Sequence, residues 1–96
     1  MSVIKVFRSY MAKNHPHIAH MDWQADVRLI PVQDIPNELL KAIMPKEISE
    51  PVTCWLFYYD DGLNNVVCLL QDQRGVRNYG IGLLKYGELV KPISFI

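Results

Sequence analysis

The sequence predicts an α+β domain in which two short helices pack on a three- to four-stranded antiparallel sheet. Proline and glycine are segregated along the chain, because all the prolines except Pro92 lie before residue 52 and every glycine lies after residue 61. Proline ends helices and stiffens connectors, whereas glycine supplies the positive φ angles of tight hairpin turns. We therefore expect helices and extended connectors in the first half and a β-meander in the second.

Size and composition predict a single globular domain over residues 1–96. Half of the residues are hydrophobic (50%), which supplies enough apolar surface for a core. A chain of this length buries about two-thirds of the surface that its unfolded form exposes, so that core needs no disulfide or metal. No internal repeat, low-complexity segment or linker divides the chain.

The first helix is predicted over residues 3–13. Val3, Phe7 and Tyr10 recur at the spacing of one helical face. Ser2 can cap the start of this helix, and residues 14–16, which include Pro16, can end it. The β-branched residues at the start leave a strand open as the alternative.

A second helix is predicted over residues 36–44, with Pro36 in the first turn and Pro45 after the end. Its apolar face consists of Leu39, Leu40, Ile43 and Met44. Between the two helices, residues 27–32 can form a short strand. Pro31 restricts that strand to a sheet edge or a connector, because proline cannot donate a ladder hydrogen bond.

The second half of the chain predicts the meander. Residues 53–59, 66–70, 76–84 and 89–95 are rich in β-forming side chains, and turn-forming residues separate them. Strands this short need a packed face, so we expect the two helices to cover one face of the sheet. Residues 53–59 are large and apolar on both faces, which favours a central strand.

The chain has two cysteines, Cys54 and Cys68, and both lie in apolar runs. Small secreted domains usually carry more cysteines at disulfide spacing, so we expect two buried, reduced thiols. A two-residue turn at residues 61–62 would place Cys54 opposite Leu69 and Cys68 on the other face. The N-terminus lacks the pattern of a signal peptide, and no run approaches the roughly 18 apolar residues of a membrane span. The expected location is the cytoplasm, without a membrane partner.

Charge is balanced, with ten Lys and Arg against ten Asp and Glu. Nucleic-acid-binding domains usually carry a large positive excess, which makes a protein the more expected partner. A net charge near zero also gives little repulsion between copies of the chain.

One cluster has the chemistry of a metal site: His15, His17, His20 and Asp22 lie within eight residues. Imidazole and carboxylate groups bind zinc and other transition metals, so a metal-binding protein or a metal-dependent hydrolase is one hypothesis. The same histidines could act as the general acid and base of a metal-free ribonuclease. The competing interpretation is a solvated loop whose imidazoles make local hydrogen bonds. No phosphate-binding, zinc-protease or nucleophile-elbow motif is present, so the sequence gives no catalytic residue and enzyme activity has little support.

A second group of residues suggests a binding surface. It consists of Trp23, Arg74, Arg77, Tyr79 and Tyr86. Arginine and aromatic side chains are enriched at protein interfaces. If the strand over residues 76–84 is regular, Arg77, Tyr79, Ile81 and Leu83 share one face, and the Arg77/Tyr79 part of that face could instead stack on single-stranded nucleic acid. Trp23 follows Asp22 in a polar connector, which suggests an exposed anchor.

These observations lead to three hypotheses. The first is a small non-enzymatic protein-interaction module without a cofactor: a regulator, inhibitor or immunity-type protein that occupies a partner's surface. Such a module can also form a homodimer, because an unprotected sheet edge is a template for another strand. The alternatives are the metal site of the histidine cluster and single-stranded nucleic-acid binding by Arg77 and Tyr79.

Overall fold

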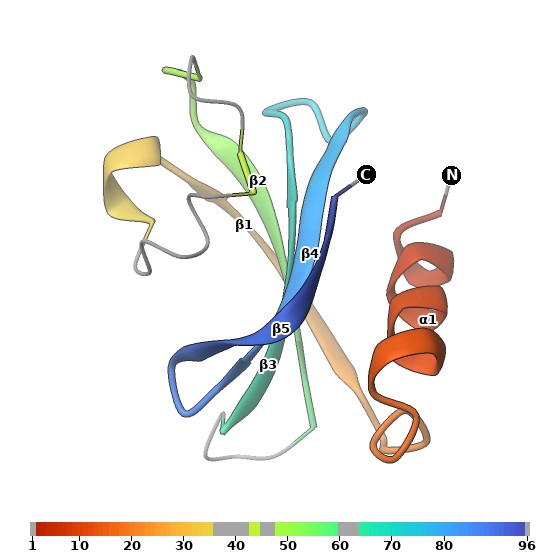
Figure 1. Ribbon diagram of the computed structural model, residues 1–96. Helices are drawn as coiled ribbons and strands as arrows, with labels where there is room; N and C mark the ends of the chain where they lie inside the picture. Colours follow the sequence, from red (N-terminus) through yellow and green to blue (C-terminus); the bar gives the residue numbers. More distant parts are fainter. Residues whose placement is uncertain (1, 36–42, 45–47, 60–63, 96) are drawn as a thin grey trace.

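The computed structural model describes residues 2–35, 43–44, 48–59 and 64–95. In chain order the elements are α1 (Val3–Asn14), β1 (Gln24–Ile30), the 3-10 turn η1 (Val32–Asp34), β2 (Val52–Tyr58), β3 (Asn65–Gln71), β4 (Asn78–Lys85) and β5 (Glu88–Phe95). The strands form one antiparallel sheet in the order β1-β2-β3-β4-β5 (Figure 1). The α+β class and the meander are confirmed, with five strands instead of three or four. None of the described helices is long and apolar enough to cross a membrane.

The first predicted helix is confirmed as α1, whereas most of the second predicted helix (residues 36–44) lies outside the described residues. Ile43 and Met44 are described and lie in a turn, where Ile43 is buried. The additional strand is β1, which begins before the predicted residues 27–32 and ends before Pro31. It lies at the sheet edge, as predicted, although Pro31 lies just beyond the end of the strand.

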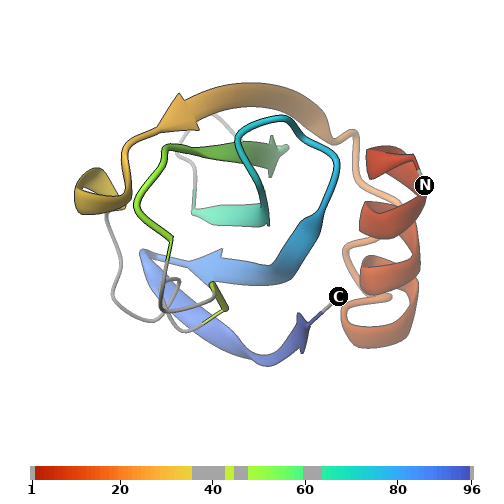
Figure 2. The same ribbon diagram turned by 90° about the horizontal axis from the view of Figure 1, so that it is seen from above.

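The sheet is covered on both faces, by α1 on one and by the described part of the connector between β1 and β2 on the other (Figure 2). On the α1 face, Phe7 stacks on Phe57 with ring centroids 4.1 Å apart. On the opposite face, Ile35 and Ile43 pack in the cluster that contains Val52. We expected the two helices to cover one face, but Ile43, which belongs to the second predicted helix, packs on the face opposite α1. Because the central strands carry apolar side chains on both faces, each face needs its own cover.

The register of β2 and β3 differs from the predicted one by one residue. Cys54 pairs with Leu70, and Leu56 pairs with Cys68. The connection runs from residue 59 to residue 64 instead of forming a two-residue turn. A slip of one residue moves every side chain to the other face, so both cysteines lie on the face opposite α1.

An irregularity between β3 and β4 changes which side chains share a face. Leu70 pairs with Gly80 but Gln71 pairs with Asn78, so Tyr79 is the extra residue of a bulge. Tyr79 packs in the cluster that contains Cys68, whereas Ile81 and Leu83 pack under α1. The predicted common face of Arg77, Tyr79, Ile81 and Leu83 is therefore wrong.

The hairpin between β4 and β5 has a two-residue turn, formed by Tyr86 and Gly87. Tyr86 and Gly87 have φ angles of 52° and 82°. Positive φ at both central residues is the signature of a type I′ turn, whose twist matches that of the strands it joins.

Candidate functional site

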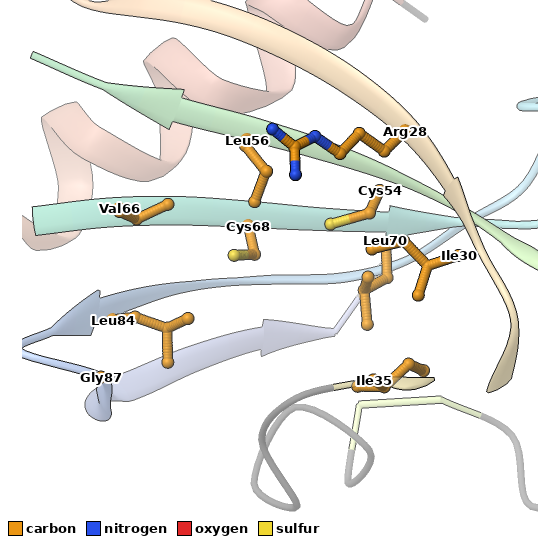
Figure 3. Close-up of a pocket in the computed structure, with 10 residues that line it drawn as sticks. All are labelled: Arg28, Ile30, Ile35, Cys54, Leu56, Val66, Cys68, Leu70, Leu84 and Gly87. Atoms are coloured by element: carbon orange, nitrogen blue, oxygen red, sulfur yellow. The ribbon is translucent and has the colours of Figure 1, made fainter. Parts of the chain in front are cut away.

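A cavity of about 230 Å³ lies on the sheet face opposite α1 (Figure 3). Its described walls are aliphatic and consist of Ile30, Ile35, Leu56, Val66, Leu70 and Leu84. Two thiols, Cys54 and Cys68, and one charged side chain, Arg28, complete the described lining together with Gly87. The cavity therefore combines an apolar interior with two nucleophilic groups and a cation.

The two thiols line the same cavity from neighbouring strands and act on each other's pKa. Both cysteines are free and buried, as the sequence predicted. The hydrogen bond from Cys68 lowers the pKa of Cys54, burial opposes this, and the positive charge of Arg28 lowers the pKa of Cys54 further. The same hydrogen bond and burial raise the pKa of Cys68 well above its ordinary value. Cys54 is therefore the sulfur that ionises first, and Cys68 keeps its proton and donates it to Cys54.

Arg28 connects this cavity to the sheet edge. It pairs with Cys54 in the register of β1 and β2. Its Nε donates to Asp26 Oδ2 at 3.3 Å, in an exposed ion pair. Figure 3 shows its guanidinium reaching from β1 toward Leu56, at the border of the cavity.

The outer edge of β1 has no neighbouring strand among the described residues. The Val27 N–H donates to its neighbour Asp26 Oδ1 at 3.0 Å, so this N–H points away from β2. Backbone groups alternate in direction along an antiparallel strand, which means that Ala25 and Leu29 also direct their N–H and C=O groups outward. Val27 and Leu29 expose 47% and 56% of their surface. The edge is thus both unpaired and apolar.

A second cavity, of about 270 Å³, lies beside this edge between α1 and the start of β1. Its described lining is Ile4, Phe7, Arg8, Ala19, Met21, Asp22, Trp23, Ala25 and Phe57. Ala25 belongs to both the edge and the cavity, so the cavity adjoins the edge of β1, and Arg8 and Asp22 make its lining partly polar.

The histidine cluster does not converge. His15 is 5% exposed and turns inward, where its Nε2 lies 3.1 Å from the Tyr10 hydroxyl. His17, His20 and Asp22 are exposed. Among the described residues, no three His, Cys, Asp or Glu side chains are grouped so that they could hold a metal ion. Of the predicted ligands His15, His17, His20 and Asp22, all within the described part of the chain, only His15 and His17 are in ring contact, with centroids 6.3 Å apart.

The predicted partner-binding residues are spread over the molecule. Trp23 is half-buried, with its indole N–H donating to the Ile18 carbonyl at 3.0 Å. Tyr79 is 7% exposed beneath the Arg77 guanidinium, which leaves little of its ring for a base or a partner. Arg74 and Tyr86 are exposed, in turns at opposite ends of β4. A partner-binding role for these residues stays a prediction.

The buried imidazole of His15 gives a pH dependence that can be measured. Burial and, second, the charge of His17 lower the pKa of His15, so the folded state resists its protonation. The unfolded chain takes up that proton near its ordinary pKa of about 6.5. The free energy of unfolding should therefore fall as the pH falls from about 7 to about 5. Urea unfolding at several pH values in this range measures how the free energy of unfolding changes with pH. His15→Gln should reduce that change. The control His20→Gln, at an exposed site, should leave it unaltered.

The chain matches no protein-family model, no curated protein and no solved structure.

Proposed function

We propose that the protein is a small, non-enzymatic interaction module whose working surface is the free edge of β1, and that its partner is a second copy of the chain. One observation carries the proposal: β1 is self-complementary about Val27. Adding a strand to an open sheet edge is a recurrent mode of protein recognition, because backbone hydrogen bonds supply affinity and side chains supply specificity.

The register follows from the backbone directions. Val27 directs its N–H outward, so a two-fold axis can pass beside a hydrogen-bonded Val27–Val27 pair between two antiparallel β1 strands. In this register Ala25 pairs with Leu29 of the second copy, and Leu29 with Ala25. The three pairs exchange about six backbone hydrogen bonds, since each such pair exchanges two.

The side chains complement each other on both faces in this register. On one face Asp26 lies opposite Arg28 of the second copy, and Arg28 lies opposite Asp26. On the other face Leu29 of the second copy lies over the small side chain of Ala25, at the mouth of the cavity beside α1. Opposite charges and apolar side chains in cross-strand positions both stabilise a strand pair.

Other symmetric registers are less favourable. A two-fold axis at residue 26 places Asp26 opposite Asp26, and an axis at residue 28 places Arg28 opposite Arg28. Like charges directly opposite each other destabilise a pair of strands. The existing bonds from Asp26 to Val27 and Arg28 are exposed and within one chain, so breaking them costs little.

The expected dimer is weak and depends on concentration. One strand from each copy, with the adjacent cavity, provides less than the roughly 1,200 Å² of buried surface at the lower bound of stable interfaces. Such a contact suits a reversible regulator, because a β1 edge that is paired with a second copy cannot bind another partner at the same time. The same mode would let a strand of a target protein take the place of the second copy.

Charge reversal tests the register. Asp26→Arg and Arg28→Asp each replace both attractive pairs with repulsive ones and should weaken dimerisation about ten- to a hundredfold. The double variant Asp26→Arg/Arg28→Asp exchanges the charges and should restore it. Both side chains are exposed, so the fold should tolerate these changes. Sedimentation equilibrium measures the association of all four chains.

Two results would contradict the proposal. The first is a wild-type chain that stays monomeric at ~1 mM, which corresponds to less than about 4 kcal/mol of binding. The second is a double variant that associates no better than either single variant, because that result assigns the loss to something other than the Asp26–Arg28 pairing.

A further inference from the structure

We propose that the cavity opposite α1 is a covalent binding site for a small apolar α,β-unsaturated carbonyl compound, which adds to the sulfur of Cys54. The inference is independent of the self-pairing of β1. It rests on the placement of two thiols and one guanidinium around an aliphatic cavity.

The cavity sets the size and character of the ligand. A cavity of about 150 Å³ lined by aliphatic and aromatic side chains stays dry and admits benzene. This one is larger, at about 230 Å³, and all its described walls apart from Arg28 and the two thiols are aliphatic side chains or Gly87. A compound larger than benzene, with an apolar body, therefore fits it.

The three polar groups set the chemistry. Cys54 and Cys68 lie on neighbouring strands and both line the cavity, so one sulfur can act as nucleophile while the other donates a proton. Arg28 lies at the border of the cavity, where its Nε donates to Asp26 Oδ2 and its terminal N–H groups can donate to an oxygen (Figure 3). An enone offers a carbon that sulfur attacks, a carbonyl oxygen that accepts those hydrogen bonds and a tail for the aliphatic walls.

The step balances without an oxidant or a reductant. Cys54 loses its proton to solvent, and its sulfur forms a bond to the β-carbon of the enone. The π electrons of the C=C bond move to the enolate, whose oxygen accepts a hydrogen bond from Arg28. The Cys68 thiol then protonates the α-carbon and regains a proton from solvent. The net change is addition of one S–H across the double bond, and the lowered pKa of Cys54 and raised pKa of Cys68 suit these two roles.

A disulfide is the competing use of two neighbouring thiols, and the register disfavours it. Cys54 pairs with Leu70 while Cys68 pairs with Leu56, so the cysteines are diagonal neighbours. Diagonal positions have Cα atoms roughly 7–8 Å apart, beyond the usual span of a disulfide. The pair is better placed for a nucleophile and a proton donor than for a cross-link.

The test uses trans-3-octen-2-one as the apolar enone and acrylamide as a small polar comparator. Intact-mass and peptide analysis should locate one enone adduct on Cys54. Its rate should exceed that of the urea-unfolded chain by about tenfold or more, since the lowered pKa and the cavity both act only in the folded state. Acrylamide should show a smaller excess, because it gains from the lowered pKa of Cys54 but has no apolar body for the cavity to bind. A protein concentration of about 1 µM lies far below the range in which a small strand-pair interface is populated.

Variants distinguish a reaction that depends on the cavity from one that any thiol would undergo. Cys54→Ser should abolish the adduct, while Cys68→Ala and Arg28→Gln should slow it. Val66→Phe narrows the cavity without touching either sulfur, and should slow the enone but not acrylamide. The proposal is overturned if the enone modifies wild-type Cys54 no faster in the folded than in the unfolded chain, or if Val66→Phe slows both reagents equally.

Discussion

Phe57→Ala is expected to remove most of the stability of this domain. Phe57 is 1% exposed and stacks on Phe7 of α1, with ring centroids 4.1 Å apart. Truncating a buried phenylalanine to alanine costs about 3–5 kcal/mol through lost burial and the cavity left behind. The total stability of a small domain is roughly 5–15 kcal/mol, so this one side chain accounts for a large share.

Urea unfolding and thermal melting measure this loss. The Tm should fall by on the order of 20 °C, since a domain of this size loses about 4–8 °C per kcal/mol. Phe57→Leu keeps most of the volume and should cost less than about 2 kcal/mol. Val76→Ala removes methyl groups from an exposed residue and should change the stability by no more than about 0.5 kcal/mol. If Phe57→Ala costs no more than Val76→Ala, α1 does not depend on this contact.

The elements that the sequence predicts well are those fixed by local pattern. α1 follows from apolar residues at helical spacing, and the hairpin at Tyr86 follows from its Tyr86-Gly87 turn. The end of β1 at Ile30 follows from Pro31, which cannot donate a ladder hydrogen bond. In each case the determining residues are close in sequence, so no tertiary contact has to be known.

The features that the sequence predicts poorly are those that depend on the register between paired strands. The residues between β2 and β3 include Asp61-Gly62, a pair typical of two-residue turns, but the pairing of Tyr58 with Val66 requires a longer connection. That difference moves Cys68 to the face of Cys54, and thereby assembles the thiol pair and its cavity. The bulge at Gln71 similarly buries Tyr79 and removes it from the predicted patch. Neither irregularity has a local signal that distinguishes it from regular pairing.

The residues of β1 that the proposed interaction uses are not among those that the sequence singles out as a binding surface. The sequence Ala25-Asp26-Val27-Arg28-Leu29 alternates apolar side chains with one charge of each sign, symmetrically about Val27. This pattern was available as a signal. Its meaning depends on β1 being an edge strand, since a central strand would bury both charges. Similarly, the inward turn of His15 follows from Tyr10, five residues earlier, at the end of α1.

Gln71→Leu is expected to destabilise the fold by about 2–3 kcal/mol, because it leaves two polar groups without partners. Gln71 is buried at the bulge, where its Oε1 accepts from Trp55 Nε1 at 2.9 Å and its Nε2 donates to Asn78 Oδ1 at 2.7 Å. Leucine is similar in size and more apolar, so a loss of stability cannot come from reduced hydrophobic burial. Equilibrium urea unfolding gives the change.

A double-mutant cycle with Trp55→Phe assigns that loss to the hydrogen bond. Trp55→Phe removes the indole N–H, so the unsatisfied donor that Gln71→Leu creates no longer exists in the double variant. The double variant should therefore be more stable than the sum of the two single losses predicts, by about 1–2 kcal/mol. Additive losses would show that Gln71 stabilises the bulge through Asn78 alone. Coupling would show that one buried amide joins β2, β3 and β4 at the point where the register changes, and hence maintains the register that brings Cys54 and Cys68 to one face.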